Sequence, residues 1–230
     1  MKIGGFQKTT LIDYPGKIAA SIFTVGCNFR CGYCHNPDLI DGRNIILEDE
    51  AKVLEFFKKR KNTLEGVVIS GGEPLLQKDL QDFIMQIKNL GLLVKLDTNG
   101  SNPQKLKKLL DQKLVDYVAM DIKNNLSSYD QTTNIKGSGK NIAESIDLII
   151  NSYINYEFRS TVLPDLHNEK NIEEIGIMIK GARKMYLQSF RSGVTLDEKY
   201  ATKRSFAETE MENLKTLVLK NVLSCDIRFY

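Results

Sequence analysis

Three of the four cysteines of the chain lie close together in the stretch VGCNFRCGYCHNP, which covers residues 25–37. Their spacing is Cys27-x3-Cys31-x2-Cys34. A loop with this spacing can bend three thiolates around one compact centre, and thiolates are ligands of both iron–sulfur clusters and zinc. The motif therefore predicts a metal centre held by this loop.

The choice of metal depends on the fourth ligand. A structural zinc site closes with four protein ligands, and the available fourth ligands, Cys225, His35 and His167, stand at no familiar zinc spacing. A 4Fe-4S cluster with three cysteine ligands keeps one iron open for a substrate, as catalytic metal sites do. We therefore expect the cluster, with a zinc site or three buried thiols as the alternatives.

A second motif, SGGEP at residues 70–74, follows the cysteines. Gly71 and Gly72 would let the backbone approach a ligand closely, and the carboxylate of Glu73 could accept hydrogen bonds from an ammonium group. Pro74 completes the motif, which would end a strand and precede a helix. The alternative is that the paired glycines only make a turn.

Two further segments, LDTNG at 96–100 and MDIK at 120–123, place carboxylates at the ends of apolar runs. We expect Asp97, Thr98 and Asp121, together with Lys123, to line the site. The alternatives are helix capping by Asp97 and Thr98 and a solvated surface pair of Asp121 and Lys123.

Arg159 is a charged residue within the apolar segment FRSTVLP. A charge inside a strand is costly unless it points into a polar cavity, so we expect Arg159 to face the site rather than an exposed edge. Gln188 and Arg191 are weaker candidates in YLQSFRSG. His35 and Asn36 could meet a protein substrate or brace the cysteine loop, while His167 and Cys225 are expected to be a loop histidine and a packed thiol.

These motifs need elements to position them, and short β-branched runs alternate with amphipathic segments along the chain. The expected strands cover 18–25, 66–70, 92–97, 115–122, 155–163 and 185–190, with a last strand at 222–230. The expected helices cover 48–60, 77–90, 103–112, 140–152, 171–185 and 207–220. A polar loop is expected over 124–139, and a hairpin with a turn at Pro15-Gly16 over 9–17.

Six strand–helix units in sequence imply parallel strands, since each parallel return needs a crossover helix. A complete eight-unit barrel uses roughly 250 residues. The chain has 230 residues, so we expect an α/β fold with a partial (β/α)6 open TIM-like barrel. One domain is expected over 1–230, with its core at about 15–195 and a C-terminal helix–strand appendage at about 200–230. The site residues would then lie at the carboxyl ends of the strands.

Bulk composition excludes several classes. The chain is 42% hydrophobic and 27% charged, with a formal net charge of +3, which is ordinary for a globular protein and too weakly basic to indicate nucleic-acid binding. No run of 18 apolar residues and no secretory leader pattern is present. We expect a cytoplasmic protein with reduced cysteines and no membrane partner.

The segment GCNFRCGYCHN, including the aromatic Tyr33, resembles the signature of the radical S-adenosylmethionine (SAM) superfamily. Within this superfamily, the chain is similar to the activating enzymes of glycyl-radical enzymes. It is most similar to the activating enzymes of anaerobic ribonucleoside-triphosphate reductases, and its segment TTLIDYPGK at 9–17 also fits their pattern. The resemblance implies one 4Fe-4S cluster on Cys27, Cys31 and Cys34, with SAM chelating the open iron. It implies a SAM site formed by Tyr33, the SGGEP motif, Asp97, Thr98, Asp121, Lys123 and Arg159.

The resemblance also implies a reaction and partners. SAM would be cleaved by one electron from flavodoxin or ferredoxin, and a glycine Cα hydrogen would be removed from a large glycyl-radical enzyme. The alternatives are a pyruvate formate-lyase activating enzyme, a small-molecule radical SAM enzyme, or a zinc-binding module without catalysis. For the first alternative, the resemblance implies a monovalent cation near the Asp97 and Asp121 loops.

Overall fold

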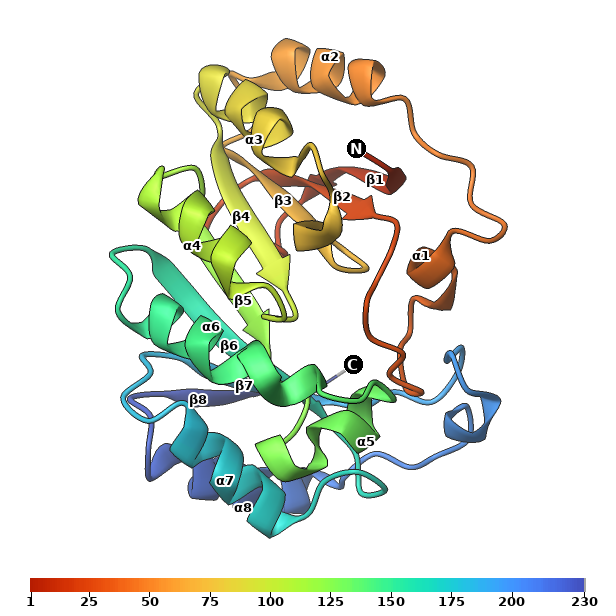
Figure 1. Ribbon diagram of the computed structural model, residues 1–230, viewed down its shortest axis with the longest axis vertical. Helices are drawn as coiled ribbons and strands as arrows, with labels where there is room; N and C mark the ends of the chain where they lie inside the picture. Colours follow the sequence, from red (N-terminus) through yellow and green to blue (C-terminus); the bar gives the residue numbers. More distant parts are fainter. Residues whose placement is uncertain (230) are drawn as a thin grey trace. The chain divides into compact units, whose positions relative to one another are not determined.

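The computed structural model describes residues 1–229 and shows an α/β protein (Figure 1). The strands are β1 (Ile3–Thr10), β2 (Ala19–Thr24), β3 (Gly66–Gly71), β4 (Leu93–Thr98), β5 (Tyr117–Asp121), β6 (Asn155–Val162), β7 (Met185–Ser189) and β8 (Cys225–Arg228). The α-helices are α1 (Pro37–Asp41), α2 (Glu50–Arg60), α3 (Leu80–Asn89), α4 (Pro103–Asp111), α5 (Tyr129–Thr133), α6 (Ile142–Ile150), α7 (Glu169–Met178) and α8 (Glu208–Leu219). The 3-10 helices are η1 (Pro74–Leu76), η2 (Leu126–Ser128), η3 (Ser138–Asn141) and η4 (Glu198–Tyr200).

The strands follow one another in chain order from β1 to β8. β1 is antiparallel to β2, whereas the pairs β2–β3, β3–β4, β6–β7 and β7–β8 are parallel. Because the order is linear, β1 and β8 end the sheet and it is not closed. The predicted α/β class with a partial, open barrel is therefore confirmed.

The chain divides into two compact units. The first contains residues 1–28, 36–98 and 104–118, and the second contains 29–35, 99–103 and 119–230. The boundary crosses β5, so each unit includes part of this strand. The expectation of a single domain over 1–230 stays a prediction, and Tyr230, which ends the predicted last strand, lies outside the described residues.

In the first unit, α2 and α3 lie next to each other and α3 packs against β4 (Figure 1). The core is made by strand side chains such as Ile22, Val67 and Leu96 and by Phe57 and Phe83 of the helices, all nearly inaccessible to solvent. This apolar packing fixes the strand ends from which the site residues project.

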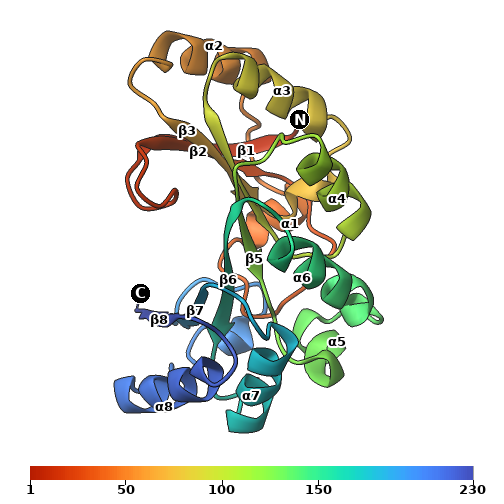
Figure 2. The same ribbon diagram turned by 90° about the vertical axis from the view of Figure 1, so that its left-hand side faces the viewer.

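A hairpin joins β1 to β2, and its loop extends away from the strands (Figure 2). The amide of Lys17 donates to the carbonyl of Tyr14 at 3.1 Å, and Gly16 has φ +70°, so Pro15-Gly16 forms the predicted turn. The strand β1 was not predicted, because its sequence IGGFQKTT contains two glycines and an incomplete polar alternation.

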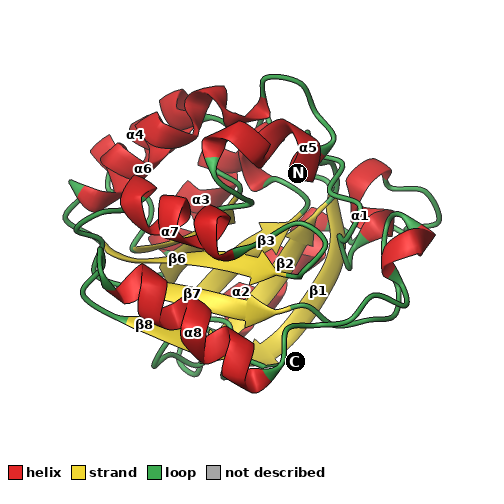
Figure 3. Ribbon diagram, turned by 90° about the horizontal axis from the view of Figure 1, so that it is seen from below, coloured by secondary structure: helices red, strands yellow, loops and turns green. Residues whose placement is uncertain are grey.

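In the second unit, α7 packs on α8, and α8 lies across β7 and β8 (Figure 3). The prediction of a polar loop over 124–139 is wrong for most of its length, since η2, α5 and the start of η3 lie there. The side chain of Asn125 accepts from the amide of Ser128 and so caps η2, and Tyr129 is fully buried. Local capping and one buried ring thus order a stretch whose composition resembles a loop.

Candidate functional site

The cysteine loop begins directly after β2, in the first unit. The amide of Gly26 donates to the carbonyl of Leu39 at 2.7 Å, and that of Cys27 donates to Ile40 at 3.2 Å. Both acceptors belong to the short helix α1, which was not predicted. Backbone hydrogen bonds to α1 therefore fix the position of the first cysteine, Cys27.

The other two cysteines lie in the second unit. The amide of Cys34 donates to the carbonyl of Cys31 at 3.0 Å, which forms a turn between them. The segment after β7 braces this turn, because the amides of Leu196 and Asp197 donate to the carbonyls of Cys34 and Gly32 at 3.0 and 2.9 Å. Sequence reasoning did not find this brace.

Gly32 and Tyr200 show how closely the brace approaches the turn. A Cβ atom built on Gly32 would lie 2.5 Å from Cε2 of Tyr200, so a side chain here would require the ring to move. The same ring lies edge-on to Tyr33, with centroids 6.3 Å apart. Both residues between the second and third cysteines therefore pack against Tyr200, which lies far away in the sequence.

Of the four cysteines, Cys31 and Cys225 are buried, and Cys27 and Cys34 are partly exposed. The chemistry of the three motif thiols suits a cluster that accepts thiolate ligands. In residues 1–229, no group of three histidine, cysteine or carboxylate side chains is placed where it could hold a metal ion. Burial raises the pKa of Cys225 to about 12, so this thiol is inert in its strand.

The SGGEP motif lies against the start of the cysteine loop within the first unit. The amide of Glu73 donates to the carbonyl of Gly26 at 2.8 Å. A Cβ on Gly72 would lie 2.2 Å from that carbonyl oxygen, and one on Gly71 would lie 2.3 Å from the amide nitrogen of Thr24. Gly71 also has φ +114°. Both glycines are therefore required for close approach of two backbones.

Glu73 is completely buried. Its Oε1 accepts hydrogen bonds from the amide of Leu75 at 3.0 Å and from Oγ1 of Thr98 at 2.8 Å. Pro74 opens η1, a short helix that was not predicted. The hydroxyl of Thr98 orients the carboxylate of Glu73, which brings together two predicted site residues, one after β3 and one on β4.

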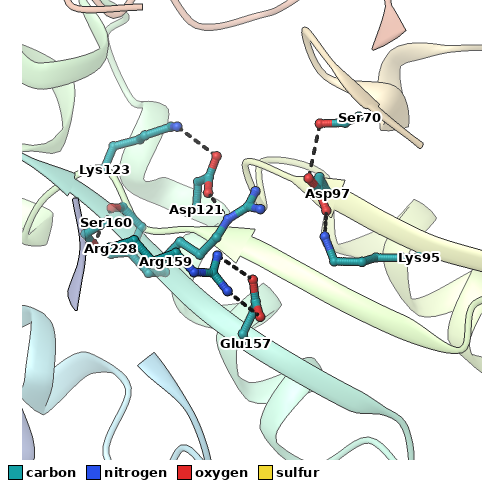
Figure 4. A network of polar contacts seen from close by, with 10 residues as sticks. Ser70, Lys95, Asp97, Asp121, Lys123, Glu157, Arg159, Ser160 and Arg228 are labelled. Carbon is teal, nitrogen blue, oxygen red and sulfur yellow. Dashed lines mark hydrogen bonds and ion pairs between the residues drawn. The ribbon is translucent and has the colours of Figure 1, made fainter. Parts of the chain in front are cut away.

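Asp97, also in the first unit, is bonded on both carboxylate oxygens (Figure 4). Oγ of Ser70 donates to Oδ2 at 3.1 Å, and Nζ of Lys95 forms an ion pair with Oδ1. Lys95 was not among the predicted site residues. The rule that identified Arg159, a charge within an apolar strand, also applies to the lysine of LLVKLD and would have found it.

Asp121, in the second unit, is bonded to two cations (Figure 4). Nε of Arg159 donates to Oδ1 at 2.8 Å and Nζ of Lys123 to Oδ2 at 3.2 Å. Burial alone would raise the pKa of Asp121, but the two cations outweigh it and hold that pKa well below its usual value. Arg159 thus faces a partly buried acid, which excludes the alternative that it lies at an exposed edge. The alternative of a solvated surface pair is also wrong for Asp121 and Lys123, because both side chains are partly buried.

A further carboxylate of this unit is neutralised from the last strand. Glu157 on β6 is almost fully buried, and both of its oxygens accept from Arg228 of β8, at 3.2 and 3.3 Å (Figure 4). The guanidinium carbon of Arg228 lies 3.5 Å from the ring centroid of Tyr186. The C-terminal strand therefore supplies a stacked, bidentate cation to the sheet.

The hydroxyl of Tyr33 is buried and has no hydrogen-bond partner among the described residues. Burial raises the pKa of Tyr33 well above its usual value, and the nearby Cys31 adds to this effect. An unsatisfied buried hydroxyl is uncommon and costs stability. Its position in the cysteine motif makes Tyr33 suited to meet a polar atom of a bound group.

His35 lies at a cavity of about 230 Å³ in the second unit, which is lined by His35, Thr161, Gln188, Ser189 and Arg191. Its ring stacks on Phe190 at 5.3 Å, and Nδ1 lies 3.1 Å from the carbonyl oxygen of Val194. The structure thus brings together His35 and the two weaker candidates of the seventh strand segment, Gln188 and Arg191. Asn36 precedes α1 without a side-chain cap.

His167 is a loop histidine, as expected, but it is buried. Its Nδ1 accepts from the amide of Leu163 at 3.3 Å, which leaves Nε2 to donate to the carbonyl of Lys123 at 2.9 Å. Burial lowers the pKa of His167, which favours this neutral form. His167 therefore braces the backbone of a predicted site residue, a role that the sequence did not indicate.

The described helices include none that is long and apolar enough to cross a membrane.

Comparison with known proteins identifies the superfamily to which the chain belongs. The family model of the Radical SAM superfamily matches residues 21–180, so the chain belongs to that superfamily. The crystal structure of Streptococcus suis SuiB bound to S-adenosylmethionine shares the fold, with a TM-score of 0.67 at 12% identity over 90% of this chain and 48% of SuiB.

Sequence relatives define the family more narrowly. The chain is 32% identical over 233 residues to "Putative glycyl-radical enzyme activating enzyme MJ1227" of Methanocaldococcus jannaschii, covering 98% of this chain and 95% of that protein. It is 32% identical over 189 residues to the pyruvate formate-lyase-activating enzyme of Clostridium pasteurianum, covering 79% and 77% of the two chains. The chain belongs to the family of glycyl-radical enzyme activating enzymes, and the predicted family is confirmed at this level. The superfamily implies a 4Fe-4S cluster and SAM.

Proposed function

We propose that Cys27, Cys31 and Cys34 hold the 4Fe-4S cluster and that the protein uses SAM to install a glycyl radical on a partner enzyme. The similarity to an activating enzyme over 98% of this chain carries the proposal, and the presence of three cysteines in one loop supports it. When bound and reduced, the cluster supplies the electron that cleaves SAM to methionine and a 5′-deoxyadenosyl radical.

The roles of the other residues follow from their contacts. Glu73 would accept hydrogen bonds from the amino group of SAM, and Thr98 and the amide of Leu75 hold its carboxylate in one orientation. Because Glu73 is buried, its charge is poorly screened by water and would attract an ammonium strongly. The Gly71-Gly72 backbone packs beside the cysteine loop, which would place this carboxylate near the first cysteine.

The remaining predicted residues would contact the ribose and carboxylate of SAM. Asp97 follows Lys95 on β4, while Asp121, Lys123 and Arg159 form a second charged group at the end of β5 and on β6. The cationic groups of this second set suit a carboxylate ligand. The buried hydroxyl of Tyr33 would meet a polar atom of the bound cofactor.

Cysteine replacement tests the ligand set. After anaerobic reconstitution, Cys27→Ala, Cys31→Ala and Cys34→Ala should each fall well below the roughly four irons per chain of a 4Fe-4S cluster and form no 5′-deoxyadenosine. Iron analysis and chromatography of the SAM products measure both effects. Cys225→Ala is the matched control and should keep the cluster, because its thiol is buried in β8 with a raised pKa. Loss of the cluster in Cys225→Ala would contradict the three-ligand set.

We propose anaerobic ribonucleoside-triphosphate reductase as the partner, with a glycine Cα hydrogen as the atom removed. The supporting observation is the match of residues 9–17 to the pattern of reductase activators, and these residues include an ordered turn at the hairpin. Flavodoxin or ferredoxin would supply the electron. A cytoplasmic location follows as a prediction from these partners.

A second candidate partner is pyruvate formate-lyase, which is favoured by the similarity to its activating enzyme in Clostridium pasteurianum. Incubation of the reduced, SAM-loaded protein with each partner separates the two. A glycyl doublet in the EPR spectrum is expected with the reductase and not with the lyase. A doublet with the lyase alone would reverse the assignment, and no doublet with any glycyl-radical enzyme would reject the activase proposal.

A further inference from the structure

His167 is almost fully buried in the loop that follows β6. Two hydrogen bonds to Leu163 hold its imidazole in place. The amide of His167 donates to the carbonyl of Leu163 at 3.0 Å, and Nδ1 of the ring accepts from the amide of Leu163 at 3.3 Å. Because Nδ1 accepts, the proton of the neutral ring lies on Nε2. This donor is therefore directed out of the loop with a fixed orientation.

Nε2 contacts the loop that follows β5, where it lies 2.9 Å from the carbonyl oxygen of Lys123. The amide of Lys123 donates to the hydroxyl of Tyr129 at 3.3 Å. His167 and Tyr129 are both buried, so the two backbone groups of Lys123 are bonded to side chains of the interior. The ammonium of Lys123 forms an ion pair with Asp121 at 3.2 Å. The backbone from which this ammonium extends is thus fixed from two sides.

A second side chain joins the same two loops in the opposite direction. Asn124 is completely buried, and its Nδ2 donates to the carbonyl of Leu166 at 2.9 Å and to Oγ1 of Thr132 at 2.9 Å. His167 reaches from the loop after β6 to the loop after β5, and Asn124 reaches back. A shift of either loop would leave a buried polar group without its hydrogen bond, which is costly. The two loops are therefore locked together.

We infer that His167 is a positioning residue for Lys123 and that its Nε2–H carries this role. The hydrogen bond to the carbonyl of Lys123 holds the loop after β5 so that the ammonium lies beside Asp121 before any ligand is bound. The lock itself rests on contacts within the second unit. The ligand part rests on the proposed function, in which the carboxylate of SAM meets this charged group.

Two substitutions separate the roles of the two ring nitrogens. In His167→Gln, the terminal amide nitrogen can take the place of Nε2 and donate to the carbonyl of Lys123. In His167→Asn, the shorter side chain takes the place of Nδ1 and reaches only Leu163. A positioning role predicts that His167→Gln keeps Lys123 in place and that His167→Asn does not. A role confined to the loop after β6 predicts the reverse.

The first measurement uses the cluster-free protein without SAM. Lysines are acetylated with a limiting amount of acetic anhydride, and peptide mass spectrometry gives the rate at each position. Lys123 should react in His167→Gln within about twofold of its rate in the wild type. In His167→Asn it should react about fivefold faster, which is the effect of losing one hydrogen bond on a local opening equilibrium. Equal rates in the two variants, or a faster rate in His167→Gln, overturn the inference.

Lys88 is the matched reference within each sample. It forms an ion pair with Asp116 at 2.7 Å, and its side chain is 27% exposed, compared with 20% for Lys123. Lys88 lies on α3 in the first unit, so its acetylation rate should be the same in the wild type and in both variants. A general loss of folding would instead raise the rate at both lysines.

A measurement on the wild type covers the case in which His167→Asn does not fold. The chain has two histidines, so nitrogen NMR of protein labelled in histidine gives two sets of ring signals, and the set missing in His167→Gln belongs to His167. Near neutral pH this ring should be uncharged with its proton on Nε2. A proton on Nδ1 overturns the inference, because Nδ1 could then not accept from Leu163 and Nε2 could not donate to Lys123.

The ligand part is tested on the reconstituted holoprotein. The dissociation constant of SAM for His167→Gln should agree with that of the wild type within about twofold, and for His167→Asn it should rise about tenfold. Equal affinities of the two variants contradict the ligand part. Absence of SAM binding to the wild type rejects the proposed function, whereas the acetylation rates and the tautomer still decide whether His167 positions Lys123.

Discussion

Asp97 and Asp121 both end a strand next to a lysine two residues away, yet their charges are compensated in different ways. In Lys95-Leu96-Asp97 the lysine precedes the acid and lies inside β4, where it is buried. In Asp121-Ile122-Lys123 the lysine follows the acid and is 20% exposed, and Arg159 of β6 adds a second cation. The same pair of residue types is thus built once with a buried lysine and once with a partly exposed lysine.

The difference lies in how deeply each lysine is buried. Removing one member of a buried ion pair is costly, whereas a partly exposed pair is screened by water. Loss of Lys95 should therefore affect the stability of the protein more than loss of Lys123.

The largest expected effect is that of Lys95→Met compared with Lys123→Met. Loss of the buried Lys95 should lower the free energy of unfolding by about 3–5 kcal/mol, as for a broken buried pair. Loss of Lys123 should cost about 1 kcal/mol, because Arg159 still pairs with Asp121 and water reaches the site. Urea unfolding at neutral pH measures both, and equal losses would contradict the difference between the two groups.

Arg159→Gln should have an intermediate effect of about 1–2 kcal/mol at neutral pH, since the glutamine can still donate to Asp121 but carries no charge. The effect should depend on pH. An unfolded aspartate has a pKa of about 3.9, and the folded pKa of Asp121 lies well below its usual value. Its stabilisation is thus complete above the unfolded pKa and is lost as the pH falls toward the folded pKa.

Removing Arg159 brings the folded and unfolded pKa values of Asp121 closer together. The fall in stability between pH 7 and pH 3 should then be smaller in Arg159→Gln than in the wild type. Urea unfolding at the two pH values tests this sign. A variant that loses more stability on acidification than the wild type would show that Arg159 does not lower this pKa.

The smallest expected effect is that of Tyr33→Phe, near the Asp121 group. The hydroxyl of Tyr33 has no partner in the described part of the chain, so its removal from the cluster-free protein should be neutral or stabilise it by up to about 1 kcal/mol. If SAM uses the hydroxyl, Tyr33→Phe weakens SAM binding to the holoprotein at the same time. A destabilised cluster-free variant would show that the hydroxyl is satisfied in solution.

Much of this architecture follows from local sequence patterns. The parallel strands were predicted to within about three residues at each end, because β-branched runs such as GVVIS and helices with apolar stripes have distinct periods. The helix predicted over 171–185 ends at Met178, since the chain turns before β7. The strand β1 and the helices within 124–139 were missed because pairing partners and buried rings, not local composition, determine them.

The site was predictable in its residue types and only partly in its contacts. The motifs correctly placed Glu73, Asp97 and Asp121 at strand ends, where parallel topology brings side chains to one edge. The partners of these acids depend on register between strands, as in Ser70 with Asp97 and Arg159 with Asp121. Lys95, which was not predicted, differs from these partners, because a charged residue inside an apolar run can be recognised from the sequence alone.

Isotope labelling tests most directly whether the protein removes the glycine Cα hydrogen of its partner. The reductase partner, prepared with glycine deuterated at Cα, is incubated with the reduced, SAM-loaded protein, and the 5′-deoxyadenosine formed is examined by mass spectrometry. The 5′-deoxyadenosine should gain one deuterium as the glycyl radical appears. Unlabelled 5′-deoxyadenosine, formed while the partner acquires its radical, would contradict direct removal of the glycine Cα hydrogen.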